Sequence, residues 1–274
     1  MLNSIIAVAS GGAEDGELLN VAGALAARLQ AQVRVIPAFP DPAADLIYYG
    51  AALGTALPEA ALERVTAAER EKQKAIEQKV GAVAAAKNAQ FVVDKREFAP
   101  AAATASAVVL ADLAMVHGVN ARGGLAGLFA ETLITAQSPC LLINSANERF
   151  DTVAIAWDGS AQAGRAVRAA VPILRLASRV LVFSNIDDAA SPAGAASPAR
   201  LSEYLQRCGV RNVASRELRG EHVAASLLEA TRAEACDLLV SGAYGRPRLY
   251  EMVLGGTTRA LVHTAEAPHL LLAH

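Results

Sequence analysis

The chain repeats one pattern of strands and helices twice, and this repeat restricts the folds that it can adopt. SIIAVASGG (residues 4–12) and TVAIAWDGS (152–160) are both apolar segments that end in a turn containing glycine. Each is followed by an alanine-rich segment with helical spacing and then by a second apolar run, VRVIPAF (33–39) or RVLVFSNID (179–187). Apolar strands that alternate with helices of this length predict parallel sheets with helices on both faces.

Later segments of the two halves correspond as well. ADLAMVHG (111–118) matches CDLLVSGA (236–243), and SPCLLIN (138–144) matches APHLLLAH (267–274). We therefore predict an α/β fold of two tandem domains, residues 1–147 and 148–274, each an open five-stranded parallel sheet. The first half has extra length, which we interpret as a loop and a long amphipathic helix with a solvated charged face.

The composition excludes several classes of protein. A chain with 53% hydrophobic and 19% charged residues can bury a large core and does not resemble a disordered chain. The net charge of −2 and the aromatic content of 4% argue against nucleic-acid binding, which needs clustered cations or stacking rings.

The cysteines and the length of the apolar runs predict the cellular compartment of the protein. Cys140, Cys208 and Cys236 are odd in number and far apart, which excludes a complete disulfide framework and a CxxC-type zinc site. Each lies beside apolar residues, so we expect reduced thiols in the cytoplasm. No window approaches the ~20 apolar residues of a membrane span, and the N-terminus lacks the basic region of a signal peptide.

The second half carries the strongest indication of a binding site. Ligands of open parallel sheets bind beyond the carboxyl ends of the strands. WDGS, NID and SGAYG follow three strands of this half, and the glycine-rich stretch GAYGRPRLYEMVLGGTT (242–258) then leads into a helix. A helix N-terminus suits an anion, so the stretch predicts a phosphate-binding loop. The alternative is that its first two glycines only allow a tight crossing from strand to helix.

These residues resemble the nucleotide loop of the universal stress protein family. The shared features are the spacing Gly242-x2-Gly245-x9-Gly255 before a threonine, a first strand that ends at Asp158, and a last strand preceded by Pro268. The tandem halves resemble the two-domain members, and the resemblance covers nearly the whole chain. It implies an adenine nucleotide alpha hydrolase-like fold that binds ATP, with Mg²⁺ as a companion ion.

The resemblance also implies roles for individual residues. Asp158 would face the adenine or ribose, the first two glycines would let the backbone approach ribose and phosphate, and the loop end would hold the phosphates. Two positions depart from the family pattern: Asn185 is usually apolar and Gly256 is usually Ser or Thr. The implied nucleotide-binding residues are Asp158, Asn185, Gly242, Gly245, Gly255, Gly256, Thr257 and Thr258.

The first half lacks these residue types. Alignment of the halves sets Ser10 against Asp158, His117 against Gly242, Asn120 against Gly245 and Phe129 against Thr258. We therefore expect a degenerate domain that does not bind ATP in the family manner. SGGAED (10–15) is close to the SGGxDS loop of ATP pyrophosphatases, but its aspartate comes one position late, so we expect an ordinary turn. We interpret His117 as a loop histidine.

The sequence therefore predicts a cytoplasmic stress-response protein that binds an adenine nucleotide in its C-terminal domain and acts as a regulator or sensor. No catalytic motif and no metal site stand out. We expect the two domains to form an internal pseudo-dimer through their last strands, and two chains to pair as a homodimer. The alternatives are a nucleotide-free adaptor of the same fold and a very slow ATPase, which the lack of an acidic pair for a metal disfavours.

Overall fold

The computed structural model describes residues 2–40, 59–95, 106–185, 196–220, 222–243 and 256–274. Strands and helices alternate through both halves, as the sequence predicts. The elements are β1 (Ser4–Ala9), α1 (Asp15–Leu29), β2 (Gln32–Pro37), α3 (Glu59–Lys87), β3 (Gln90–Val93), β4 (Leu113–His117), α4 (Gly118–Arg122), α5 (Ala126–Ala130), a π-helical turn (Glu131–Thr135), β5 (Cys140–Ile143), β6 (Thr152–Ala156), α6 (Ala161–Leu174), β7 (Arg179–Asn185), α7 (Pro198–Arg207), β8 (Val213–Leu218), α8 (Val223–Ala233), β9 (Leu238–Gly242), α9 (Gly256–His263) and β10 (His269–Ala273).

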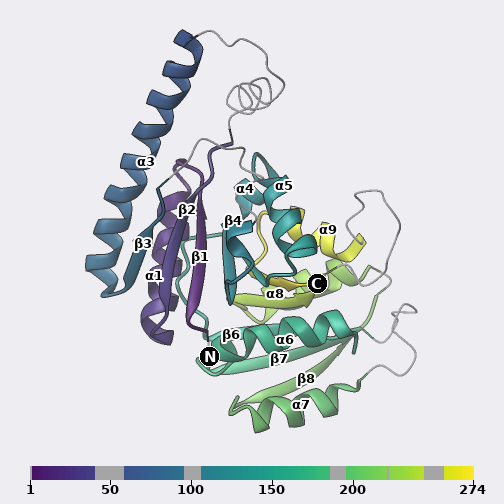
Figure 1. Ribbon diagram of the computed structural model, residues 1–274. Coiled ribbons are helices and arrows are strands. Elements are labelled where there is room, and N and C mark those ends of the chain that lie inside the picture. The colour runs from purple at the N-terminus through teal and green to yellow at the C-terminus, as the bar shows by residue number, and fades with distance from the viewer. Residues whose placement is uncertain (1, 41–58, 96–105, 186–195, 221, 244–255) are drawn as a thin grey trace. The chain divides into compact units, whose positions relative to one another are not determined.

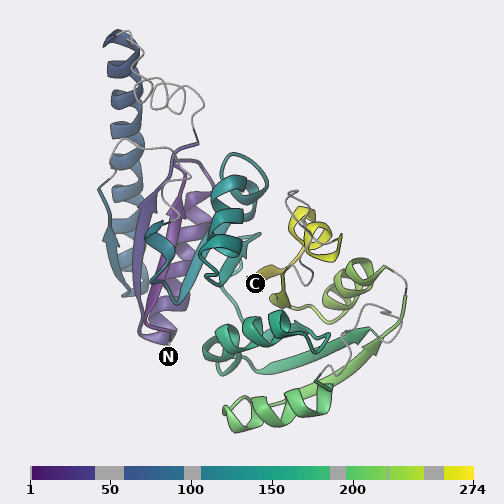
Figure 2. The same cartoon turned by 45° about the vertical axis from the view of Figure 1, so that its right-hand side comes forward.

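The contacts divide the chain into two compact units, Leu2–Ser138 and Pro139–His274. In the N-terminal unit the strand order is β3-β2-β1-β4, and all these pairs are parallel. The long helix α3 packs on α1, which in turn packs on the strands (Figures 1 and 2). The helix predicted from the charged segment of the first half is therefore confirmed.

The C-terminal unit has the strand order β5-β10-β9-β6-β7-β8. Its five strands from β6 to β10 are parallel, as predicted, while β5 pairs with β10 in the antiparallel direction and sets Leu142 opposite Leu270. The strand predicted from SPCLLIN is thus present and groups with this unit. A boundary between two family domains at residues 147 and 148 stays a prediction.

The cores form because the sequence places apolar side chains on the inner faces of both element types. All strand residues of β4, β5 and β10 are buried. On α6, Ala163, Ala166, Val167 and Ala170 are buried at helical spacing, and this face packs on β9 and β10. Burial of each Val or Leu side chain contributes about 1.5–3 kcal/mol, so these stripes determine how the helices dock.

An aspartate serves the same structural purpose in both units. Asp112 precedes β4, and its Oδ2 accepts hydrogen bonds from the backbone N–H groups of Asn3 and Ser4 at 2.7 and 3.0 Å. Asp237 precedes β9, and its Oδ2 accepts from the backbone N–H groups of Asp151 and Thr152 at 2.8 and 2.9 Å. Each carboxylate therefore ties the start of the first strand of its half to the start of the fourth.

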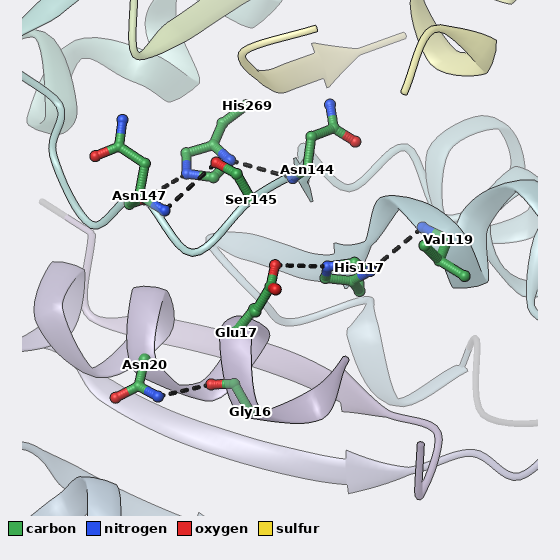
Figure 3. Close-up of polar contacts among 9 residues, drawn as sticks. All are labelled: Gly16, Glu17, Asn20, His117, Val119, Asn144, Ser145, Asn147 and His269. Atoms are coloured by element: carbon green, nitrogen blue, oxygen red, sulfur yellow. Dashed lines mark hydrogen bonds and ion pairs between the residues drawn. The ribbon is translucent and has the colours of Figure 1, made fainter. Parts of the chain in front are cut away.

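A buried histidine ties the connection between β5 and β6 to the start of β10. His269 Nδ1 accepts from the backbone N–H of Asn144 at 3.2 Å, and its Nε2 lies 2.6 Å from the carbonyl oxygen of Asn147 (Figure 3). Because the first partner can only donate and the second can only accept, the ring is neutral with its proton on Nε2. The ring also packs against Phe150, with 5.8 Å between centroids. His269 therefore has a structural role.

All three cysteines are free, and burial raises the pKa of the Cys140 and Cys236 thiols to about 12. Neither thiol is therefore ionised near neutral pH. Within the described ranges, no helix combines the length and the apolar character that a membrane crossing requires.

Candidate functional site

The predicted site lies at the carboxyl ends of the parallel strands in the C-terminal unit. Asp158 directly follows β6, Asn185 ends β7 and Gly242 ends β9. Helix α9 begins with Gly256, Thr257 and Thr258, and it starts at the same edge because it runs antiparallel to the strands before β10. Gly245 and Gly255 lie outside the described residues. The structure thus brings the described members of the predicted set to one edge of the sheet.

The turn between β6 and α6 presents an exposed carboxylate. Asp158 Oδ1 accepts from the backbone N–H of Ser160 at 2.9 Å, and Gly159 between them has a φ of 73°, which suits glycine. The Ser160 hydroxyl caps α6 by accepting from the Ala163 N–H at 3.1 Å. Among the described residues, Asp158 Oδ2 has no hydrogen-bond partner, so this oxygen is available to a ligand.

Trp157, the neighbour of Asp158, belongs to the core. Its side chain is buried, and its indole N–H donates to the carbonyl oxygen of Ala196 at 2.7 Å. The indole therefore packs in the core and does not offer a platform for a base.

Asn185 has a structural partner that its sequence position does not reveal. Its Nδ2 donates to the carbonyl oxygen of Gly220 at 2.9 Å and so ties the end of β7 to the segment after β8. The polar amide thus has at least one hydrogen-bond partner within the same unit. This bond gives Asn185 a structural role, so no ligand is needed to explain a polar residue at a position that is usually apolar in the family.

Gly242 is required by packing. A Cβ atom at this position would lie 2.5 Å from the backbone nitrogen of Ala163 and 2.8 Å from the carbonyl carbon of Gln162. Both atoms belong to the backbone at the start of α6, so they cannot move aside as a flexible side chain would. Gly242 therefore permits a close approach between the end of β9 and the start of α6, and its part in a phosphate-binding loop stays a prediction.

The start of α9 is exposed. Among the residues that the structure describes, none has an atom within 4 Å of a Cβ atom placed on Gly256. The first N–H groups of an α-helix have no intrahelical partner and carry a partial positive charge, so this end suits a phosphate group. Thr258 is 6% exposed, so little of its side chain is accessible to a ligand.

In the corresponding turn of the N-terminal unit, backbone N–H groups bind the carboxylate of a nearby aspartate. Asp15 is fully buried, and its two carboxylate oxygens accept from the backbone N–H groups of Ser10 and Gly11 at 2.9 and 2.8 Å. The Ser10 hydroxyl donates to Glu14 at 2.8 Å, and Lys79 Nζ donates to the carbonyl oxygen of Gly12 at 2.7 Å. The amide groups that could receive a phosphate are therefore occupied by a side chain of the same unit.

His117 closes the other side of this turn. It is the last residue of β4 and caps α4, since its Nδ1 accepts from the Val119 N–H at 3.3 Å, while its Nε2 lies 3.3 Å from Glu17 Oε2 (Figure 3). The side chain is buried, with 7% of it exposed. The prediction of a loop histidine is therefore wrong: His117 is a buried strand residue that joins β4, α4 and α1.

Residues 149–272 match the family model described as "Universal stress protein family". The C-terminal half of the chain is a universal stress protein domain. Its predicted identification is confirmed, and the Asp158 turn and the start of α9 both lie within the matched residues.

Solved structures extend the fold of this family to the whole chain. A universal stress protein from Archaeoglobus fulgidus DSM 4304 matches 100% of this chain and 98% of its own length, with a TM-score of 0.73 and 14% identity. A proposed universal stress protein from Pseudomonas aeruginosa UCBPP-PA14 matches 99% of this chain and 93% of its own, with a TM-score of 0.56 and 15% identity. At these identities the likeness establishes the fold alone.

One solved universal stress protein is in complex with cAMP; it matches 45% of this chain and 97% of its own, with a TM-score of 0.36 and 19% identity. That ligand is a property of that protein. No curated protein sequence matches the chain.

Proposed function

We propose that this universal stress protein binds ATP or a related adenine nucleotide in its C-terminal domain and acts in the cytoplasm as a regulator or sensor. The observation that carries the proposal is the contrast between two equivalent turns. In the N-terminal unit the loop amides hold the buried Asp15 carboxylate, whereas in the C-terminal unit the Asp158 carboxylate is exposed. An exposed strand-end carboxylate beside an open helix start supports a ligand at this edge.

The proposed roles follow from hydrogen-bonding chemistry. Asp158 Oδ2 would accept from the ribose hydroxyls or the adenine amino group, since a carboxylate is an acceptor only. The N–H groups of Gly256, Thr257 and Thr258 would donate to the phosphates, together with Gly245 and Gly255 as carried over from the family. Gly242 and Asn185 would shape the site from the strand ends.

Magnesium would reach this site on the phosphates. In the part of the chain that the structure describes, no cluster of three or more His, Cys, Asp or Glu side chains could hold a metal ion. Phosphate oxygens and water are the usual Mg²⁺ ligands in nucleotide sites. If the chain supplies few of the Mg²⁺ ligands, the site suits nucleotide binding better than rapid phosphoryl transfer.

Two features of the assembly belong to the same proposal. We expect the two halves to form an internal pseudo-dimer through their last strands. We also expect two chains to pair as a homodimer.

The test starts from the purified full chain. Denaturation should release an adenine nucleotide that chromatography identifies, and calorimetric titration should show ATP binding to protein freed of ligand. No released nucleotide and no binding at millimolar ATP would leave the adaptor alternative. Release of ADP over hours of incubation with ATP would instead indicate the slow ATPase.

Asp158→Asn tests the carboxylate itself. The amide keeps an oxygen that accepts from the Ser160 N–H, so the turn persists while the charge and one strong acceptor are lost. Loss of a hydrogen bond to a charged group should weaken ATP binding about tenfold or more. Unchanged affinity in this variant would move the site elsewhere.

Gly256→Glu tests the start of α9. The side chain enters open space and its charge suits a helix N-terminus, so the fold should persist while the phosphates are repelled, with a loss of affinity on the order of tenfold. Gly127→Glu is the matched control, because Gly127 precedes Pro139 by as many positions as Gly256 precedes Pro268 and also has open space. The proposal requires that only Gly256→Glu weakens binding.

A further inference from the structure

An open groove of about 710 Å³ lies at the opposite edge of the C-terminal sheet, where β7 and β8 begin. Three arginines line it: Arg175 at the end of α6, Arg207 at the end of α7 and Arg211 in the turn before β8. Figure 1 shows α7 and β8 at the outer edge of this unit. The groove is therefore separate from the strand ends that carry Asp158 and Gly242.

The three guanidinium groups are poorly compensated. Arg207 lies 3.6 Å from Glu203, but these side chains are 77% and 66% exposed, so solvent screens their attraction. Arg175 Nε donates to the carbonyl oxygen of Cys208, which leaves its terminal nitrogens available. Among the residues that the structure describes, Arg211 has no ion-pair partner. The groove thus carries more donors and positive charge than the described acceptors use.

Helix capping accounts for only part of this arrangement. Arginines are common near the ends of helices because they complement the partial negative charge there, and Arg175 at the end of α6 donates to the carbonyl oxygen of Cys208, the C-cap residue of α7. Arg211 lies beyond the end of α7, after Gly209 with its φ of 80°, and so is not a last-turn residue of this helix. Its presence beside the other two calls for another explanation.

Backbone bonds hold the floor of the groove in place. Ser178 is fixed by its N–H, which donates to the Asp151 carbonyl oxygen at 2.8 Å, and by its own carbonyl oxygen, which accepts from Asn212 Nδ2 at 2.9 Å. The Asn212 carbonyl oxygen in turn accepts from the Val180 N–H at 3.0 Å. The floor between the arginines is therefore held in place, so a ligand would have to order the arginine side chains but not the backbone beneath them.

We propose that this arginine groove binds a small anion that carries phosphate groups. Guanidinium groups present paired N–H donors that match phosphate oxygens, and three of them from separate segments can bind more than one phosphate. The volume lies within the range of small-molecule sites. The net charge of −2 of the whole chain disfavours a nucleic acid, which would require a longer basic track. This site does not depend on the nucleotide proposal.

The probe is inorganic triphosphate, titrated calorimetrically into the full chain at low salt. The double variant Arg207→Gln/Arg211→Gln should weaken binding by about tenfold for each lost charge-assisted contact. The matched control is Arg200→Gln, an exposed arginine in the first turn of the same helix. It should bind as the wild type does. Binding should also weaken as salt is raised, because exposed charges are screened.

Triphosphate could also reach the start of α9, so the titration is repeated in Gly256→Glu. The groove proposal requires that binding persists in Gly256→Glu and falls in the double arginine variant. Loss of binding in Gly256→Glu alone would place the anion at the nucleotide site and overturn the proposal. Equal losses in Arg200→Gln and the double variant, or no binding by the wild type, would overturn it as well.

Discussion

At the scale of single residues, two carboxylates decide how the equivalent turns of the two halves differ. Asp158 follows its strand directly, accepts a hydrogen bond from the Ser160 N–H two positions later and stays exposed. Asp15 comes five positions after Ser10 and turns back so that both of its oxygens accept from loop amides. The later position of this aspartate in SGGAED is thus what lets the N-terminal turn satisfy its own N–H groups.

Asp15 should make the stability of the N-terminal unit depend on pH. Burial raises the pKa of its carboxyl group above the ordinary 3.8, although the Ser10 and Gly11 N–H groups and Lys79 act in the opposite direction. The folded state then binds more protons than the unfolded state just above pH 3.8, so the contribution of Asp15 to stability falls as pH rises through that window. The free energy of unfolding, measured against urea from pH 3.5 to 7, should show this trend.

Asp15→Asn supplies the comparison, since the amide does not titrate. The difference in free energy of unfolding between wild type and variant should shift in favour of the variant as pH rises from 3.8. A difference that shifts toward the wild type would mean that the hydrogen bonds outweigh burial and that the pKa is lowered.

At the scale of elements, Gly242 sets how closely α6 approaches β9. A Cβ atom at residue 242 would lie only 2.5 Å from the backbone nitrogen of Ala163. Gly242→Ala should therefore force α6 away from the sheet. Displacement of a packed helix should lower the free energy of unfolding by about 1–3 kcal/mol. Thermal or urea unfolding measures this loss directly.

Gly256→Ala is the control for that substitution. It adds the same methyl group to open space at a helix position where alanine is at least as favourable as glycine, so stability should stay the same or rise slightly. Equal stability of Gly242→Ala and the wild type would contradict the packing role of Gly242.

Helices and strands could be predicted from local sequence patterns, whereas most contacts between residues far apart in the chain could not. The strands and α3, α6 and α8 were predictable because continuous apolar runs and helical spacing are properties of neighbouring residues. The reason for Gly242 lies about eighty positions earlier, at Ala163, and no local pattern reveals it. A matched Asp in ADLAMV and CDLLVS was a usable signal for the strand ties of Asp112 and Asp237, since both halves keep it.

At the scale of the whole molecule, the two halves share a fold but offer different surfaces at their strand ends. The N-terminal turn is closed by Asp15, Glu14 and the His117–Glu17 contact, whereas the C-terminal turn leaves Asp158 exposed. A duplicated fold of this kind can use one copy for binding and the other for structure. The nucleotide proposal therefore predicts an unequal response of the two halves to ATP.

Hydrogen exchange measured by mass spectrometry should report that inequality. A ligand at a hundred times its dissociation constant stabilises the unit that binds it by about 2.7 kcal/mol, so the slowest amides of β6 and β9 should exchange about a hundredfold more slowly with ATP. Amides of β1 and β4 should be unchanged. At the same ATP concentration, Gly256→Glu with its roughly tenfold weaker binding should reduce the protection to about tenfold, and Gly127→Glu should preserve it in full. Equal slowing in both halves would show that the chain unfolds as one cooperative unit and would refute the independent response argued from Asp15 and Asp158.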